Sequence, residues 1–205
     1  HGLVARFPAM LAVDVDPRAV AVLRRDLPTL KVWQEDLLKL DHADLATSMG
    51  GPLHVIGNLP YSITTEALLS LVASPGSIRY AVVMVQKEAA ERVVAPPGSK
   101  DYSALSVMLQ IYARPRMLYS VPPTAFYPKP KVTSAILELD PLASDELPPV
   151  RVTDVLELVK AAFRQRKKSL KQSLSNYLKE RRLPLPAQFS KARAEQLKPM
   201  EFVDL

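Results

Sequence analysis

The chain has 205 residues, 48% of them hydrophobic and 23% charged, which allows a buried core and excludes an intrinsically disordered protein. Cysteine is absent, so disulfides and thiolate metal sites are excluded and a cytoplasmic setting is favoured. The three histidines lack ligand spacing and no apolar run is long enough for a bilayer, so we expect no metal, no signal peptide and no membrane partner.

Two predicted strands near the start of the chain each end in an acid. Residues 10–16 are typical of a buried strand that ends at Asp14, and residues 30–34 predict a second one followed by Asp36. In nucleotide-binding βαβ units such an acid accepts hydrogen bonds from ribose hydroxyls. We therefore interpret Asp14 as a ribose ligand, with Val15 against an adenine ring, and Asp36 as a second ligand of the same nucleoside. Asp14 and Asp16 could equally be caps of the following helix, and Asp36 could be a helix cap or a solvated acid.

A third strand, predicted at residues 52–57, leads into the tetrapeptide Asn58-Leu59-Pro60-Tyr61 and then into a helix. The tetrapeptide thus lies at the carboxyl end of a strand, where open α/β sheets bind ligands. With the backbone turned by Pro60, the Asn58 side-chain oxygen and the Leu59 carbonyl can accept from one exocyclic amino group. Tyr61 can stack on the ring, which is worth about 1–3 kcal/mol. An ordinary turn is the alternative interpretation.

The middle of the chain continues the alternation of strands and helices. We predict a strand at residues 79–85, a helix at 86–94, a mobile loop at 96–100 that could border a substrate groove, and a helix at 103–113. Strands that alternate with helices in this way favour a parallel, doubly wound sheet.

A proline-rich loop precedes the last predicted strand, residues 134–139. Prolines stiffen this loop, so Phe126 could be held where it sandwiches a base against Tyr61. Lys129 and Lys131 follow Phe126 and would be available for phosphates. Phe126 could instead be a plug of the hydrophobic core.

The composition changes at residues 141–149, which we interpret as a linker between a domain at residues 1–140 and a helical domain at residues 150–205. The chain carries a formal net charge of +6, and the helical domain contributes a dense run of cations to it. Such a run favours a phosphate-backbone surface, although it could also be a solvated face. Its proposed RNA-binding residues are Arg164, Arg166, Lys167, Lys168 and Lys171.

Taken together, the motifs resemble the ribosomal RNA adenine N6-dimethyltransferase family. The resemblance is carried by residues 13–16 (VDVD), residues 58–61 (NLPY) and residues 126–134 (FYPKPKVTS), and it extends over most of the chain. Residues 163–170 (FRQRKKSL) and 193–197 (RAEQL) favour the ribosome-biogenesis branch over the erythromycin-resistance methylases.

The resemblance implies a Rossmann-like methyltransferase sheet and a small C-terminal all-helical domain. By this resemblance the chain is a monomeric enzyme that transfers methyl groups from S-adenosylmethionine to adenine N6 in small-subunit ribosomal RNA of the immature subunit. Asp14 would bind the ribose, Val15 the adenine, and Asp36 with Leu37 the adenine edge of the cofactor. The target adenine would be flipped out between Tyr61 and Phe126. The motif residues that would hold it are Asn58, which would also line the cofactor site, Leu59 and Pro60.

One departure from the family concerns the glycine-rich turn that cradles the methionine end of the cofactor. Family members begin with a strand and this turn, and none of the six glycines here forms one. We therefore expect a fragment of a longer enzyme, with a sheet that exposes an unfilled central slot and with activity that could be lost.

Two other functions fit parts of the pattern. A non-catalytic RNA-binding assembly factor of the small ribosomal subunit would keep the basic helices and tolerate loss of Asn58. A DNA adenine methyltransferase uses a similar motif, but there the first residue is often aspartate and the second often proline, where this chain has Asn58 and Leu59.

Overall fold

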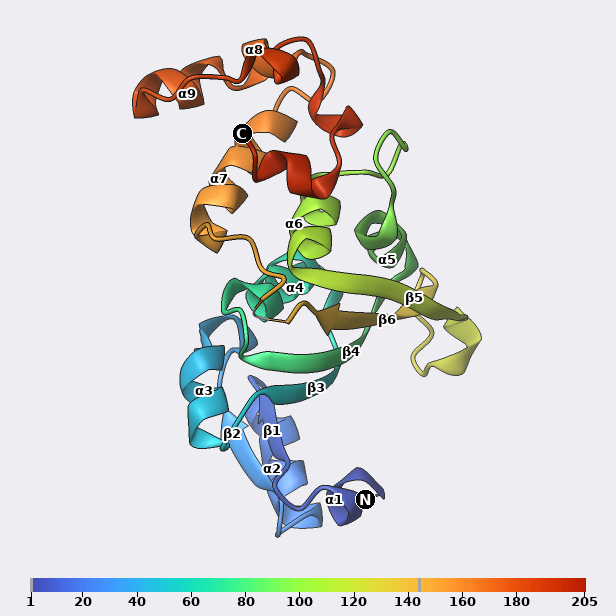
Figure 1. The fold of residues 1–205 in the computed structure, drawn as a ribbon. Helices are drawn as coiled ribbons and strands as arrows, with labels where there is room; N and C mark the ends of the chain where they lie inside the picture. Colours follow the sequence, from blue (N-terminus) through green and yellow to red (C-terminus); the bar gives the residue numbers. More distant parts are fainter. Residues whose placement is uncertain (1, 144) are drawn as a thin grey trace. The chain divides into compact units, whose positions relative to one another are not determined.

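The computed structural model describes residues 2–143 and 145–205. The chain divides into two compact units between Leu53 and His54, and each unit is described by itself. Figure 1 shows the order of the elements along the chain. Among the described helices, none combines the length and the apolar character that crossing a membrane requires.

The first unit is built on two parallel strands. Its elements are α1 (Gly2–Arg6), β1 (Leu11–Asp14), α2 (Pro17–Asp26), β2 (Lys31–Gln34), η1 (Leu37–Lys39) and α3 (His42–Ser48). β1 and β2 pair from Leu11 opposite Lys31 to Asp14 opposite Gln34. Val20 of α2 packs with Leu30 and Val32 in a small core. Both predicted strands are confirmed, and their carboxyl ends lie side by side.

The second unit holds a four-stranded sheet in the order β3-β4-β6-β5. Its elements up to the last strand are β3 (Leu53–Asn58), η2 (Tyr61–Ile63), α4 (Thr64–Ala73), β4 (Ile78–Gln86), α5 (Lys87–Val94), α6 (Ala104–Tyr112), β5 (Ala113–Val121), η3 (Pro123–Ala125) and β6 (Ser134–Pro141). The C-terminal elements are α7 (Val152–Phe163), α8 (Leu170–Ser173), α9 (Ser175–Arg181), η4 (Ala187–Phe189), η5 (Ala194–Gln196) and η6 (Pro199–Phe202).

The sheet of the second unit is not wholly parallel, contrary to the expectation from alternating strands and helices. β6 is antiparallel to both β4 and β5, between which it lies. β5 was not predicted as a strand, because Pro115 interrupts its sequence. Proline is tolerated there because β5 is the edge strand of the sheet. A strand that turns back beside its edge neighbour through a loop has to run antiparallel to it.

The helix α6 packs into the core of the second unit. Nearly all of its side chains are buried, including Leu105, Met108, Leu109 and Ile111, as expected of a helix that is apolar all round. It contacts α4 and α5 as well as α7 and η6, and Figure 1 shows it between the sheet and the C-terminal helices. The sheet and the C-terminal helices therefore share one core.

An aromatic cluster joins the C-terminal helices to this core. The rings of Tyr102 and Phe163 meet edge to face with centroids 6.0 Å apart, and Phe163 stacks on Phe202 at the same distance. The buried Tyr102 hydroxyl donates to the carbonyl of Leu197 at 2.9 Å. These contacts fix the start of α6 against the last turns of the chain.

The loop at residues 96–100, expected to be mobile, is tied down instead. The backbone N–H of Gly98 donates to the carbonyl of Glu195 at 2.7 Å. Arg166 donates to the carbonyls of Lys100 and Ser99 at 2.6 and 2.8 Å. These partners lie at least 66 residues further along the chain in the sequence, so local composition alone did not indicate them.

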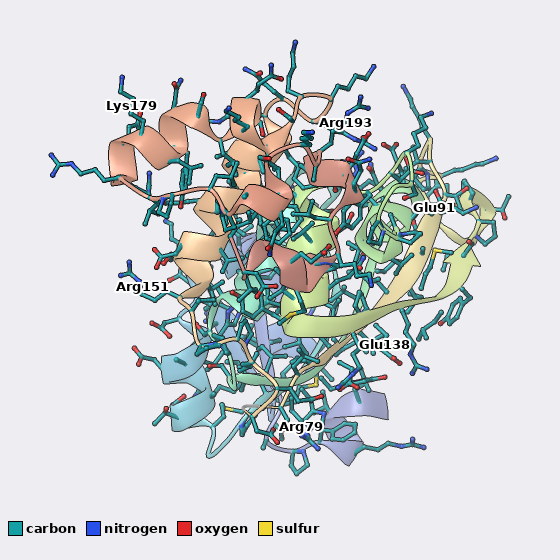
Figure 2. The ribbon with its side chains drawn as sticks, turned by 45° about the horizontal axis from the view of Figure 1, so that its top comes forward. Arg79, Glu91, Glu138, Arg151, Lys179 and Arg193 are labelled. Carbon is teal, nitrogen blue, oxygen red and sulfur yellow. The ribbon has the colours of Figure 1, made fainter. Side chains whose placement is uncertain are left out.

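A buried carboxylate, that of Glu138, links the three strands β4, β6 and β5. Glu138 of β6 lies opposite Val82 and Arg116, and its side chain is only 5% exposed. The Tyr80 hydroxyl donates to one carboxylate oxygen and Arg116 Nε donates to the other at 2.6 Å. The Tyr80 hydrogen bond, with that of Arg116, lowers the pKa of Glu138 below its ordinary value of 4.5. Figure 2 labels this residue.

This lowered pKa predicts an acid-sensitive contribution of Glu138 to stability. Ionised Glu138 stabilises the fold at pH values above its unfolded pKa, about 4.3, and this stabilisation is lost as the pH falls through the lower folded pKa. Glu138→Gln should therefore reduce the free energy of unfolding at pH 7, and its difference from the unmodified protein should shrink towards pH 3. Urea unfolding at a series of pH values measures this.

The control for this experiment is Glu88→Gln, which removes an exposed partner of Arg92. Its effect should stay below about 1 kcal/mol at every pH. If Glu138→Gln and Glu88→Gln changed the pH dependence equally, Glu138 would not be its source.

Candidate active site

The tetrapeptide Asn58-Leu59-Pro60-Tyr61 follows β3 directly and is held by backbone hydrogen bonds. The N–H of Leu59 donates to the carbonyl of Met84 on β4 at 3.0 Å, and the Leu59 side chain is buried. The carbonyl of Pro60 accepts from the N–H of Ile63 at 3.1 Å and from Thr64 Oγ1 at 3.2 Å. The loop therefore turns at Pro60 into η2 and α4, and the Asn58 side chain is left exposed.

A hydrogen bond joins this tetrapeptide to the motif at residues 126–134. The Tyr61 hydroxyl lies 2.6 Å from the hydroxyl of Ser134, which is 73 residues away in sequence and fully buried. Ser134 begins β6 and is paired with Gln86 on one side and Val121 on the other. Residues 58–61 and the end of the loop at residues 122–133 thus meet where β3 and β4 end and β6 begins.

The proline-rich loop at residues 122–133 carries three predicted site residues, which differ in exposure. The short helix η3 starts it, and the N–H of Phe126 donates to the carbonyl of Pro123 at 3.3 Å. Phe126 is half-buried, while Lys129 and Lys131 are exposed. Within residues 2–143 and 145–205 the rings in mutual contact are those of Tyr102, Phe163 and Phe202, so no direct stack of Tyr61 on Phe126 is present.

The acids of the first unit end the neighbouring strands β1 and β2. Asp14 Oδ1 accepts from the N–H of Asp16 at 2.8 Å, and the backbone carbonyl of Asp14 accepts from the N–H of Glu35 at 3.1 Å. Asp14 Oδ2 has no donor among the described residues. Val15 is 67% exposed. An exposed apolar side chain beside an acceptor oxygen fits one face and one hydroxyl of a nucleoside.

Two of the acids near the ends of β1 and β2 cap helices. Asp16, not Asp14, caps α2 by accepting from the N–H of Arg18 at 2.8 Å. Asp36 caps η1 by accepting from the N–H of Leu38 at 3.0 Å, and its neighbour Leu37 is half-buried. The capping interpretation thus accounts for Asp36 through one carboxylate oxygen, while it does not account for Asp14.

The cations of the helical segment differ in their surroundings. Arg166 is half-buried and fully hydrogen-bonded, because its Nε donates to Glu195 Oε2 at 2.6 Å and its other nitrogens donate to the loop carbonyls described above. The remaining predicted cations are exposed: Arg164, Lys167, Lys168 and Lys171. Local sequence alone does not distinguish Arg166 from the other four cations, since the partners of Arg166 lie far along the chain.

Two residues at this edge were not singled out from the sequence. Ser134 fixes the Tyr61 ring through its hydroxyl, and no local pattern indicates a contact between residues so far apart. Tyr127 is fully exposed beside Phe126, and its position between an aromatic residue and a proline was the one available signal.

Comparison with known proteins identifies first the fold and then the family. A dimethyladenosine transferase from Plasmodium falciparum is 20% identical with a TM-score of 0.74, and the match covers 94% of this chain and 78% of that one. The 23S rRNA methyltransferase ErmE is 25% identical with a TM-score of 0.63, covering 100% of this chain and 87% of that one. The chain therefore has the Rossmann-like fold of these methyltransferases.

The sequence relatives specify the family. The ribosomal RNA small subunit methyltransferase A of Salinibacter ruber is 41% identical over 203 residues, which are 99% of this chain and 69% of the relative. The family described as ribosomal RNA adenine dimethylase matches residues 2–205. The chain belongs to the ribosomal RNA adenine dimethylase family.

The hydrogen bond between Tyr61 and Ser134 predicts an energetic coupling across the site. Tyr61→Phe and Ser134→Ala should each destabilise the protein, and the double variant should cost less than the sum by about 1 kcal/mol. Urea unfolding of the four proteins measures this coupling. Purely additive effects would show that the two hydroxyls do not interact.

Proposed function

We propose that this protein transfers methyl groups from S-adenosylmethionine to the N6 atoms of adenines in small-subunit ribosomal RNA, giving dimethyladenosine during ribosome biogenesis in the cytoplasm. The observation that carries this proposal is the hydrogen bond between Tyr61 and Ser134, which holds two separate motifs at one sheet edge. Membership of the family supports the same reaction. The name of the relative in Salinibacter ruber supports the small subunit as the source of the RNA.

The proposed roles follow from the chemistry of adenine N6. This nitrogen is a weak nucleophile because its lone pair is delocalised into the ring. Hydrogen bonds from its protons to the Asn58 side-chain oxygen and the Leu59 carbonyl favour a pyramidal nitrogen. Its lone pair is then no longer delocalised into the ring and can point toward the methyl group of the cofactor. Tyr61, fixed through Ser134, would stack on one face of the base, and Phe126 would cover the other. Positioning and electrostatics then supply most of the rate enhancement.

The proposed cofactor site uses the acids at the ends of β1 and β2. Asp14 would accept from the ribose hydroxyls through Oδ2, Val15 would lie against the adenine, and Asp36 with Leu37 would contact the adenine edge. The cofactor supplies an activated methyl group on a sulfonium centre. With the cofactor bound, the methyl group would pass to N6 as its bond to sulfur breaks. The Asn58 oxygen and the Leu59 carbonyl would hold the N6 protons, and the proton displaced by the methyl group would be lost to water.

The remaining proposed roles concern RNA. We assign phosphate contacts to Lys129 and Lys131 beside the target base and to the exposed cations of the helical segment. The proposed division is a methyltransferase domain at residues 1–140, a linker at residues 141–149 and a helical RNA-binding domain at residues 150–205. Immature small subunits would be the natural partner of the monomer.

Replacement of Tyr61 separates catalysis from RNA binding. Tyr61→Ala should slow methyl transfer about tenfold to a hundredfold, because the base loses a stacking platform worth about 1–3 kcal/mol. Its affinity for RNA should change little if the basic helices dominate binding. Transfer of a labelled methyl group to small subunits that lack the modification, beside fluorescence anisotropy with the same RNA, measures both.

The matched control is Tyr119→Ala, which removes an exposed tyrosine on β5. Its methyl transfer should equal that of the unmodified protein. Unchanged transfer by Tyr61→Ala would contradict the stacking role. Calorimetry that finds no binding of S-adenosylmethionine, together with intact RNA affinity, would favour a non-catalytic assembly factor.

The exposed cations predict a steep dependence of RNA binding on salt. Contacts of Arg164, Lys167, Lys168 and Lys171 with four phosphates correspond to a slope of log affinity against log salt of about −3 for single-stranded RNA. Lys167→Gln with Lys168→Gln should flatten this slope by about one to two units. A flat salt profile of the unmodified protein would exclude the basic surface as an RNA site.

A further inference from the structure

A polar cleft lies between the helix α7 and the segment formed by α8 and α9. Its volume is about 440 Å³, within the range of small-molecule sites. On α7 and the turn that follows it the cleft is lined by positions 157, 160, 161, 164 and 165, and on the facing segment by positions 173, 176, 177, 180 and 181. Both sets recur at helical spacing, so each wall is one helix face. In Figure 2, Lys179 marks α9.

The α7 wall of this cleft is the polar face of the helix. The apolar face of α7, which includes Val155, Leu158 and Val159, is buried in the core. The cleft side carries charged and carboxamide side chains, most of them exposed. Apolar packing therefore does not close the gap between the two helices, and the polar side chains remain available to a ligand.

One end of the cleft is organised by Arg181. Its guanidinium lies 4.1 Å from the centroid of the Tyr177 ring, and its Nη2 lies 2.5 Å from Glu157 Oε2. Tyr177 is half-buried. An arginine held between an aromatic ring and a carboxylate loses little further freedom when a ligand binds beside it.

Several other polar groups of the cleft have no partner among residues 2–143 and 145–205. The side chains of Lys160, Arg164, Gln165 and Asn176 form no hydrogen bond or ion pair with any residue in the described part of the chain. The hydroxyl of Ser173, which also lines the cleft, is buried and lacks a hydrogen-bond partner there. Buried polar groups are nearly always hydrogen-bonded, so an unpartnered one at a cleft indicates a missing ligand or solvent molecule.

The charges of the cleft favour a singly charged anion. Three cations, Lys160, Arg164 and Arg181, face two acids, Glu157 and Glu180. Arg181 and Glu157 neutralise each other, which leaves a surplus of one positive charge. A phosphodiester carries one negative charge, and carboxamides such as those of Asn176 and Gln165 match the donors and acceptors of a base edge.

We propose that this cleft binds one unpaired nucleotide of an RNA strand, with its phosphate on Lys160 and Arg164, its base edge on Asn176, and its ring beside Tyr177. The proposal rests on the proposed RNA-modifying function and adds a second nucleotide site, apart from the one that holds the target adenine. Arg164 belongs both to the cleft and to the exposed cations that continue to Lys171. A strand that follows those cations can therefore place a nucleotide in the cleft.

The test compares a cleft variant with a matched control. Lys160→Met with Asn176→Ala removes one charge and one carboxamide inside the cleft. Lys191→Met with Gln188→Ala removes the same groups from exposed positions outside it. Fluorescence anisotropy measures the affinity of each protein for a single-stranded oligoribonucleotide and for a blunt RNA duplex, and thermal unfolding confirms that both variants fold.

The cleft variant should bind the single strand about tenfold more weakly than the control variant, which corresponds to the loss of one specific contact. Both variants should bind the duplex equally, because a paired base cannot enter the cleft. A single strand that carries 4-thiouridine should form a photo-crosslink with the peptide that contains Tyr177 in the unmodified protein.

Three outcomes would overturn the proposal. Equal affinities of the two variants for the single strand, or crosslinks only outside α7 to α9, would exclude the cleft as a nucleotide site. Competition by adenosine or uridine monophosphate at the concentrations at which the oligonucleotide binds would assign the cleft to a free nucleotide instead. If the unmodified protein bound no RNA at all, the proposed function would fail together with this inference.

Discussion

The return of β6 between β4 and β5 is the constraint on which the candidate active site depends. Ser134, the first residue of β6, is paired on both sides as soon as the chain leaves the proline-rich loop. Its hydroxyl is therefore fixed by the sheet, and through it so is the ring of Tyr61. Because a central strand is among the least mobile parts of a fold, the ring of Tyr61 acquires the rigidity of the sheet.

A second set of contacts, made by Arg166, fixes the segment that carries the exposed C-terminal cations. Arg166 donates hydrogen bonds to Glu195 and to two carbonyls of the loop after α5, while the neighbouring cations Arg164, Lys167 and Lys168 are exposed. The helix α5 begins at Lys87, whose N–H donates to the carbonyl of Thr133 beside the active-site edge. One short helix and one partly buried arginine thus connect the proposed target-base site with the proposed RNA surface.

The parts of the fold that the sequence predicted are those set by local patterns. The acids after β1 and β2 and the turn at residues 58–61 follow directly from apolar runs and the residues that end them. β5 was missed because Pro115 and the many exposed side chains of this edge strand do not give the apolar pattern of a buried strand. The antiparallel course of β6 was missed because it depends on pairing between distant segments. The internal role of Arg166 and the tethered loop at residues 96–100 were missed for the same reason. The roles of Asn58, Phe126 and Asp14 stay predictions, since they concern ligands.

The burial of α6 on all sides has a practical consequence for dividing the chain. Its apolar surface faces the sheet on one side and α7 and η6 on the other. A shortened protein that ended at residue 140 would turn the second of these surfaces towards water as one contiguous apolar patch, and such patches promote aggregation. The sheet and the C-terminal helices share the apolar surface of α6, so half-proteins made for separate study would need α6 redesigned with a polar face.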